Sequence, residues 1–330
     1  MTLTFIFLKI SCILCLVVWL EYFLLREYNL HKILHRDLYE DPFIEYDGSS
    51  PTFPLPYRIV ITGLARNISK RIRTNLKLSR LLGSYFEKYK IIIFENDSED
   101  DTRNVIKRAM KFDPNIRLIE SNIYPDCKLR FPNLYSYGVI SRQRIAKMAF
   151  YRNVCNHFIF KYYTNYDFVI VMDMDMEGNI PILKILESIR VLDKSSTWSA
   201  ISANGRSPIP GSLGNLDTMY DAMAFCENDQ DMAESEYRNH TSFKSIIAKY
   251  IRMMRLSMVG KRYCLVKSAF NGLCIYKLED IKNCNYTDEH VCEHISLHKQ
   301  FSKLNKSMAI DLSLKIQAGH QGPKKWVDFF

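Results

Sequence analysis

The sequence predicts an α/β fold in which a mostly parallel sheet is flanked by helices. Apolar runs of strand length alternate with segments whose apolar residues recur at helical spacing. Several of these runs end in Gly, Asn or acidic residues, as strands do where a turn follows. Hydrophobic residues make up 47% of the 330-residue chain, which is enough for a full core.

The first half of the domain contains three strand predictions separated by helix predictions. Strands are expected at 57–63, 90–95 and 116–120, where β-branched and aromatic residues cluster. Helices are expected at 68–82 and 102–110, each with an apolar face. Strands that alternate with helices at this spacing predict parallel pairing.

The second half begins with a helix that opens at the capping residue Ser141. A strand at 166–172 and a helix opened by Pro181 follow. Further segments are predicted as strands at 199–203, 270–276 and 308–316, a long loop at 206–240 and a basic amphipathic helix at 241–258.

The most informative stretch is the buried strand that ends in Asp173 and Asp175. Two carboxylates at the carboxyl end of a central strand stand where open α/β sheets bind ligands. Aspartate oxygens suit Mn2+ or Mg2+, and such a cation can bridge to a diphosphate. Because unpaired acids at this position would repel each other, a bound cation explains them better than a simple surface turn does.

This pattern resembles the DxD motif of GT-A glycosyltransferases, which have a Rossmann-like mixed sheet. The loop at 95–102 resembles the second-strand loop of these enzymes, where an Asp contacts the base or ribose. The resemblance, of family 2-like or fungal capsule and large-virus type, spans residues 57–320. It implies a hexosyltransferase that uses a UDP- or GDP-sugar donor, a glycan or protein acceptor, and Mn2+ or Mg2+.

The resemblance also assigns residues of the chain to the donor and the metal. Asp173, Asp175 and His320 are the expected metal ligands, and Glu293 and Asp175 are the expected catalytic residues. Glu293 is the expected base, with Asp288 and Glu289 as alternatives. The remaining donor-binding residues are predicted to be Thr62, Gly63, Arg66, Asp97, Arg142 and Arg144, together with Asp173.

Acceptor binding is assigned to the long loop and to the Asn-Gly turn before the 270–276 strand. Loops this long in a compact domain are usually functional or mobile. The predicted acceptor-binding residues are Asp217, Tyr220, Asp221, Asn271 and Gly272.

Other interpretations stay open at this point. A membrane-tethered sugar-binding or scaffold protein could share the fold without activity. A phosphatase of the haloacid dehalogenase type also has acids after an apolar strand, but Glu177 stands where that family needs Thr or Val. His290, His294 and His298 recur every four residues, so they could share one helix face.

The N-terminus is predicted to be a signal anchor at 1–25, followed by a stem at 26–56 and the catalytic domain at 57–330. Basic residues after the anchor favour a cytosolic domain, whereas the resemblance implies a lumenal one in an internal membrane of the ER or Golgi type. Sequons occur at Asn67, Asn96, Asn239, Asn285 and Asn305, which matter only in a secretory lumen. Asn67 and Asn96 fall in the expected active-site loops and are expected to stay unmodified.

The formal charge of +9 suits an anionic donor or a membrane surface. No zinc-finger, helix-turn-helix or RNA-binding signature accompanies it, so a nucleic-acid partner is not expected. The basic run at 70–80 is interpreted as the solvated face of a helix. Seven of the nine cysteines follow the anchor, and no CxxC pair among them suggests zinc.

Overall fold

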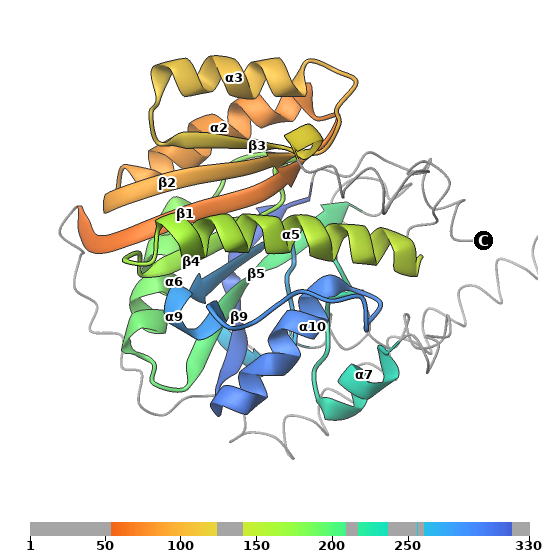
Figure 1. The fold of residues 1–330 in the computed structure, drawn as a ribbon. Coiled ribbons are helices and arrows are strands. Elements are labelled where there is room, and N and C mark those ends of the chain that lie inside the picture. The colour runs from red at the N-terminus through yellow and green to blue at the C-terminus, as the bar shows by residue number, and fades with distance from the viewer. Residues whose placement is uncertain (1–53, 124–140, 209–216, 237–255, 257–260, 319–330) are drawn as a thin grey trace, which may run out of the picture.

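The computed structural model describes residues 54–123, 141–208, 217–236, 256 and 261–318. These residues form one mixed sheet of nine strands with helices on both faces (Figure 1). The strands are β1 (Leu55–Ala65), β2 (Phe86–Glu95), β3 (Ile116–Glu120), β4 (Phe168–Met172), β5 (Trp198–Pro208), β6 (Asp217–Met219), β7 (Tyr263–Val266), β8 (Leu273–Lys277) and β9 (Ser307–Gln317).

Helices connect these strands, and the four longest of them stand where the sequence predicts helices. The helices are α2 (Ser69–Gly83), α3 (Thr102–Phe112), η1 (Ser121–Ile123), α5 (Arg142–Tyr162), α6 (Ile182–Lys194), α7 (Asp229–Glu234), α9 (Leu278–Ile281), α10 (Glu293–Lys299) and η3 (Gln300–Leu304).

The strand order is β3-β2-β1-β4-β8-β5-β9-β7, and β6 pairs with β5. Strands β1 to β4 are mutually parallel, and β8 runs antiparallel between β4 and β5. Strand β9 is parallel to β5, and β7 is antiparallel to β9. The carboxyl ends of β1 to β4 therefore meet at one edge of the sheet.

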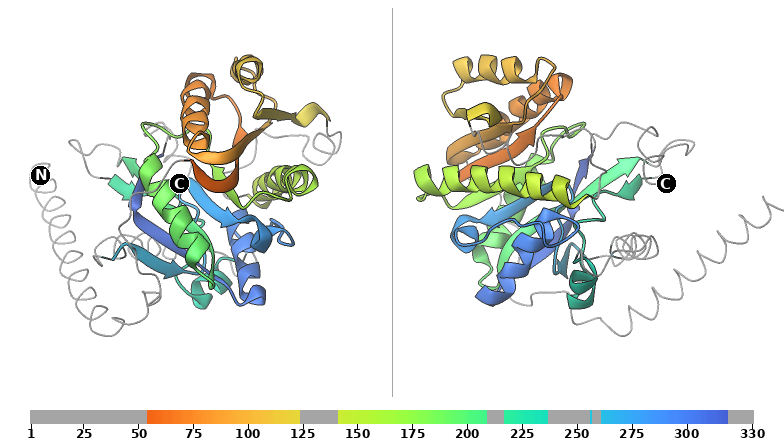
Figure 2. Two further views of the ribbon diagram at one scale, coloured as in Figure 1. Left: turned by 90° about the vertical axis from the view of Figure 1, so that its left-hand side faces the viewer. Right: turned by 45° about the vertical axis from the view of Figure 1, so that its right-hand side comes forward.

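Alternate residues of the central strands fill two separate cores. Ile59 and Ile61 of β1 pack with α2, α3 and α6, whereas Val60 packs with α5 and α10. The same alternation places Ile91 and Ile92 of β2 in different cores. The view on the left of Figure 2 shows α2 and α3 across β1–β3 from α5.

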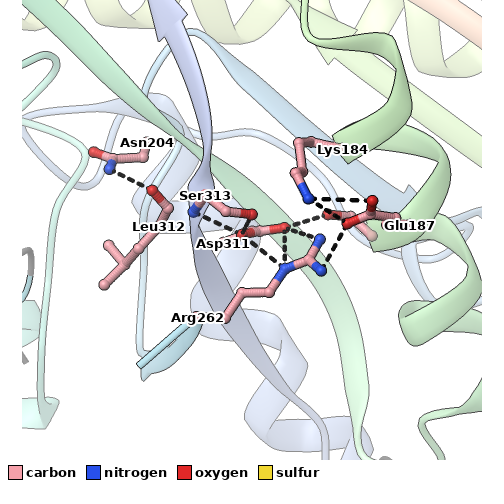
Figure 3. A network of polar contacts seen from close by, with 8 residues as sticks. Lys184, Glu187, Asn204, Arg262, Asp311, Leu312 and Ser313 are labelled. Atoms are coloured by element: carbon pink, nitrogen blue, oxygen red, sulfur yellow. Dashed lines mark hydrogen bonds and ion pairs between the residues drawn. The ribbon is translucent and has the colours of Figure 1, made fainter. Parts of the chain in front are cut away.

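A network of polar contacts connects β9 to neighbouring elements (Figure 3). The fully buried Asp311 accepts from Nη2 of Arg262 at 3.0 Å and from the Ser188 hydroxyl at 2.7 Å. The amide of Asn204 donates to the Leu312 carbonyl at 2.9 Å, where the pairing of β5 with β9 shifts register. Beyond this bulge, β9 reaches the segment that follows β4.

Most predicted elements are confirmed, with longer strands than the patterns indicate. Strand β2 begins at Phe86 rather than at residue 90, and β5 runs on to Pro208. The predicted loop at 206–240 contains β6 and α7, and β7 was not predicted. The idea of three histidines on one helix face is wrong, because α10 begins at Glu293, after His290.

The helices in the described ranges include none that is long and apolar enough to cross a membrane. The predicted anchor and most of the stem lie outside these ranges, as does nearly all of the predicted helix at 241–258.

Candidate active site

The loop that follows β4 carries Asp173 and Asp175, and neighbouring elements fix its backbone. The Asp173 N–H donates to the Gly272 carbonyl at 2.9 Å, and the Glu177 N–H donates to the Gln317 carbonyl at 3.0 Å. Both acids are partly exposed, whereas Met174 and Met176 on either side of Asp175 are buried. Acidic and buried apolar side chains therefore alternate along this loop. As a result, both carboxylates reach the surface at the carboxyl edge of the sheet.

Asn75 on α2 holds the same loop from the other side. Its side-chain amide donates to the carbonyl of Met174 at 2.9 Å and to that of Met176 at 3.0 Å. These carbonyls flank Asp175, and Asn75 is 1% exposed. One buried side chain thus fixes the backbone on both sides of the second acid.

Gly63 on β1 leaves room for this loop. A Cβ atom there would lie 2.3 Å from the Met172 carbonyl oxygen and 2.7 Å from Cγ of Met174. No side chain fits at that separation, so the glycine permits the close approach of β1 to the acidic loop. The structure gives Gly63 this packing role, and its predicted contact with a donor stays a prediction.

Tyr220 and Arg152 contact the first acid. The Tyr220 hydroxyl donates to Oδ2 of Asp173 at 3.2 Å, and Nη2 of Arg152 lies 3.8 Å from Oδ1. Burial and the neighbouring Asp175 raise the pKa of Asp173 to about 7, although Arg152 and Tyr220 oppose the shift. The electrostatics of the loop thus favour a cation beside Asp173.

Arg152 also joins the first acid to Glu293, the first residue of α10. Its Nε atom donates to Oε1 of Glu293 at 2.8 Å. The guanidinium carbon lies 5.1 Å from the Phe270 ring centroid and 5.9 Å from that of Tyr286. Burial lowers the pKa of Arg152, but Glu293, Tyr286 and Asp173 together raise it above its usual range, so the arginine stays charged.

Asp221 is a strained residue near the same acids. Its φ angle is 65°, a conformation that few residues other than Gly adopt. Burial, Asp173 and Glu293 all raise the pKa of Asp221 well above its usual value. These carboxyl groups therefore disfavour each other's ionisation, and the guanidinium of Arg152 opposes the shift.

The second-strand loop lies at the same edge. Asp97 also has a positive φ, 49°, and its Oδ1 accepts from the Ser121 hydroxyl at 2.7 Å. Asn96 is buried and accepts from the Tyr151 hydroxyl at 2.8 Å. Asp97 thus remains a partly exposed carboxylate at this edge, and its predicted base or ribose contact is untested.

The other predicted donor residues are spread over a wider area. Thr62 is buried and donates to the Ile92 carbonyl at 2.9 Å, so its hydroxyl faces the sheet interior. Arg66 is partly exposed one residue after β1. Arg142 is exposed and pairs with Asp288 at 2.8 Å, and Arg144 is exposed on the same helical turn. Neither Arg142 nor Arg144 contacts Asp173, whereas Arg152 on the same helix does.

The predicted acceptor residues divide in the same way. Tyr220 and Gly272 contact Asp173 directly, the latter through its carbonyl. Asn271 is fully buried with its amide donating to the Ala203 carbonyl at 2.8 Å, so its side chain supports the turn. Asp217 is the first residue of β6.

The imidazole of His294 lies beside Glu293. Nε2 of His294 lies 3.7 Å from Oε1 of Glu293, while the ring stacks on Phe270 with centroids 3.7 Å apart. Burial and Arg152 lower the pKa of His294 well below its usual value. The ion-pair partner that orients Glu293 is therefore Arg152 rather than the histidine next to it in sequence.

The described ranges contain no cluster of three or more His, Cys, Asp or Glu side chains arranged to hold a metal. Asp173 and Asp175 fit a hard cation through their oxygens and their mutual repulsion, with the other ligands coming from water or a diphosphate. The predicted third ligand, His320, lies outside the described residues.

Sequence reasoning missed the two residues that organise the acidic loop. Arg152 lies within the helix predicted to begin at Ser141, and a charge amid Phe150, Tyr151 and Val154 is itself a signal of a buried partner. Asn75 gave no comparable signal, because an Asn on a basic helix is ordinary.

No protein-family model and no curated protein sequence matches the chain. Among solved structures, it resembles a mannosyltransferase from Pyrobaculum calidifontis in complex with GDP-Man and Mn2+, with a TM-score of 0.53 and 11% identity over 95% of this chain and 69% of that chain.

Two further solved structures have lower TM-scores. One is glucosyl-3-phosphoglycerate synthase from Mycobacterium tuberculosis in complex with UDP (0.42, 14% identity, 82% of this chain, 75% of that chain). The other is S. aureus TarS 1–349 in complex with UDP-GlcNAc (0.44, 12% identity, 82% of this chain, 60% of that chain). At these identities the likeness is one of fold, and the first structure carries it. The described part of the chain has a mixed α/β fold of the GT-A type.

Proposed function

We propose that the protein is a glycosyltransferase that moves a sugar from a nucleoside diphosphate sugar to a hydroxyl group of a glycan or protein acceptor. The observation that carries the proposal is the pair Asp173 and Asp175 on a fixed loop at the carboxyl end of β4. Ligands of open α/β sheets bind at this edge. The GT-A-type fold, and the GDP-Man and Mn2+ of the mannosyltransferase that it resembles, support the same function.

Asp173 and Asp175 would hold Mn2+ or Mg2+ together with the donor diphosphate. Such a cation would supply Lewis acidity that stabilises the leaving diphosphate. The Tyr220 hydroxyl and the Arg152 guanidinium orient Asp173, and Asn75 fixes the backbone of Asp175. The chain thereby presents two carboxylates whose separation is set before the donor arrives.

Glu293 is the proposed base of an inverting reaction. Its carboxylate would accept the proton of the acceptor hydroxyl as that oxygen attacks the anomeric carbon. Arg152 keeps the side chain in one orientation. Tyr220 and Asp221 would contact the acceptor. In a retaining reaction no such base is needed, and Glu293 would bind an acceptor hydroxyl instead.

A thermal-shift screen of the full-length protein tests donor binding. Ligands are UDP, GDP and CMP, each with and without Mn2+. A ligand present at a hundred times its dissociation constant stabilises the folded state by about 2.7 kcal/mol. We expect stabilisation by UDP or GDP that depends on Mn2+. Absence of any shift with both diphosphates would contradict the proposal, and phosphate release from simple phosphoesters would favour the phosphatase.

We further propose that residues 1–25 anchor the protein in an internal membrane and that the domain is lumenal. Away from the expected active-site loops, the described residues include two exposed sequons for a test, Asn285 and Asn305. Glycan attached to either residue in cells would support the lumenal side. A mature N-terminus beyond residue 25 would contradict the retained anchor.

A further inference from the structure

Helices α2 and α3 carry an unusually one-sided charge. Helix α2 contains five Lys or Arg residues and α3 contains four, and neither helix contains Asp or Glu. An acidic residue in the first turn would favour a helix, so the composition does not serve helix stability alone. The two helices pack side by side over β1 to β3 (Figure 1).

The outward side chains of both helices form what we call the basic face. All six residues are exposed, and their spacing places them along one side of each helix. They are Lys70, Arg73, Lys77, Lys107, Arg108 and Lys111.

Four of these six residues have no acidic partner within the described ranges. Lys107 and Arg108 pair with Glu120 and Asp101, but no ion pair joins the other four to a described carboxylate. Charges left free on one face hold an excess positive potential, which attracts an anionic surface.

Two large apolar side chains protrude at one end of the basic face. Phe112 is 79% exposed and Leu81 is 48% exposed. They lie close together, because Arg80 beside Leu81 donates to Asp113 beside Phe112 at 2.9 Å. Basic residues around an exposed aromatic and a leucine make a surface that suits the headgroup region of a membrane.

The positions of the ends of α2 and α3, and of the first described residues, favour a membrane over a free polyanion as the partner. Helices α2 and α3 run back from the carboxyl ends of their strands, so Leu81 and Phe112 lie at the opposite edge from Asp173. The described chain enters at that same edge, where the Leu55 N–H donates to the Tyr85 carbonyl at 2.7 Å. Residues 26–54 link this point to the apolar segment that the sequence predicts as an anchor.

We propose that the basic face is a docking surface for an anionic lipid membrane, with Leu81 and Phe112 entering the headgroup layer. In this orientation the edge that bears Asp173 and Asp175 faces away from the bilayer, toward acceptors in solution. The proposal depends neither on sugar transfer nor on the lumenal placement proposed above.

The test uses the full chain in liposomes of phosphatidylcholine alone, or with about 30% phosphatidylserine, and measures lysine acetylation by mass spectrometry. One basic residue near an anionic leaflet raises affinity about fivefold. We expect Lys77 and Lys111 to be acetylated at least about fivefold more slowly in the anionic liposomes. Lys315, exposed near the carboxyl end of β9, serves as the reference that does not change.

Matched variants separate docking from general charge. In the double variant Lys77→Glu with Lys111→Glu, acetylation is measured at Lys70, and in Phe112→Ser it is measured at Lys77 and Lys111. Both variants should lose the protection by anionic lipid. Lys315→Glu should keep it. Salt at about 0.5 M should also abolish it, because the Debye length shortens. Equal acetylation in the two lipids would overturn the proposal. Equal protection by heparin or a short RNA without lipid would also overturn it and assign the face to a polyanion.

Discussion

The Nε atom of Arg152 lies 2.8 Å from Oε1 of Glu293, and these side chains are only 7% and 6% exposed. The same guanidinium lies 3.8 Å from Asp173, so it joins the acidic loop of β4 to the start of α10. A buried ion pair of this kind contributes little net stability, but removing one partner leaves the other charge buried without compensation.

Arg152→Met should therefore destabilise the protein by about 3–5 kcal/mol, measured by denaturant unfolding. The control is Arg58→Met, which breaks an ion pair with Glu87 whose side chains are 34% and 43% exposed. That variant should cost less than about 1 kcal/mol. Equal losses of unfolding free energy in the two variants would show that Arg152 does not form a buried ion pair on which stability depends.

Asn75→Ala should weaken Mn2+ binding in the presence of nucleoside diphosphate by about 10–100-fold, because the backbone around Asp175 loses its two amide hydrogen bonds. Titration of the full chain with Mn2+, followed by electron paramagnetic resonance, measures this. Asn75→Asp should be at least as damaging, since a carboxylate repels both carbonyls.

Ser79→Ala is the matched control for Asn75. Ser79 is equally buried one turn later on α2, but it contacts Met172 in the strand rather than the loop. The Ser79→Ala variant should leave the affinity for Mn2+ unchanged. If both alanine variants weaken binding alike, Asn75 has no specific effect on the loop.

Glu293→Gln should lower kcat by about 10²–10⁴-fold while donor affinity stays the same, if the reaction inverts. The amide keeps the shape of the side chain and can still accept from Arg152. Steady-state kinetics with varied donor separates kcat from KM. Near-normal kcat would reject the base role, and Glu289→Gln, a change at an exposed neighbour, would then be measured in the same way.

The pH dependence of stability should report on His298. Its Nδ1 and Nε2 meet the hydroxyls of Ser268 and Tyr276 at 2.8 and 2.9 Å, and burial lowers its pKa to about 3. The unfolded chain binds a proton near pH 6.5, so stability is full above that pH and falls as the pH drops toward 3.

Between pH 7 and pH 5 the loss from His298 should be about 2 kcal/mol, on the scale of 1.36 kcal/mol per pH unit. His298→Gln retains hydrogen bonding without a titratable ring. Between these pH values its free energy of unfolding should therefore fall by about 2 kcal/mol less than that of the unsubstituted protein. Denaturation curves of both proteins at the two pH values measure the difference. Equal losses would mean that His298 is protonated in the folded state or solvated.

The sequence was most informative where a pattern is local. The alternation of strands with helices predicted the parallel pairing of β1 to β3, and Asp173 with Asp175 stood out at the end of β4. Contacts between distant segments were not predictable in this way. Arg152 and Glu293 are separated by 141 positions, and only the packing of α10 on α5 brings them together. The close approach of Gly63 to Met172 and Met174 is likewise a contact between distant segments.

The central claim is metal-dependent sugar transfer through the acidic pair, and donor turnover tests it most directly. The full chain is incubated with UDP- and GDP-sugars, with and without Mn2+, and released nucleoside diphosphate is measured. We expect release that needs Mn2+ and that falls by at least about 100-fold in Asp175→Asn. Asp229→Asn, a change at a side chain that is 81% exposed on α7, should be unaffected. Undiminished Mn2+-dependent release by Asp175→Asn would contradict the account.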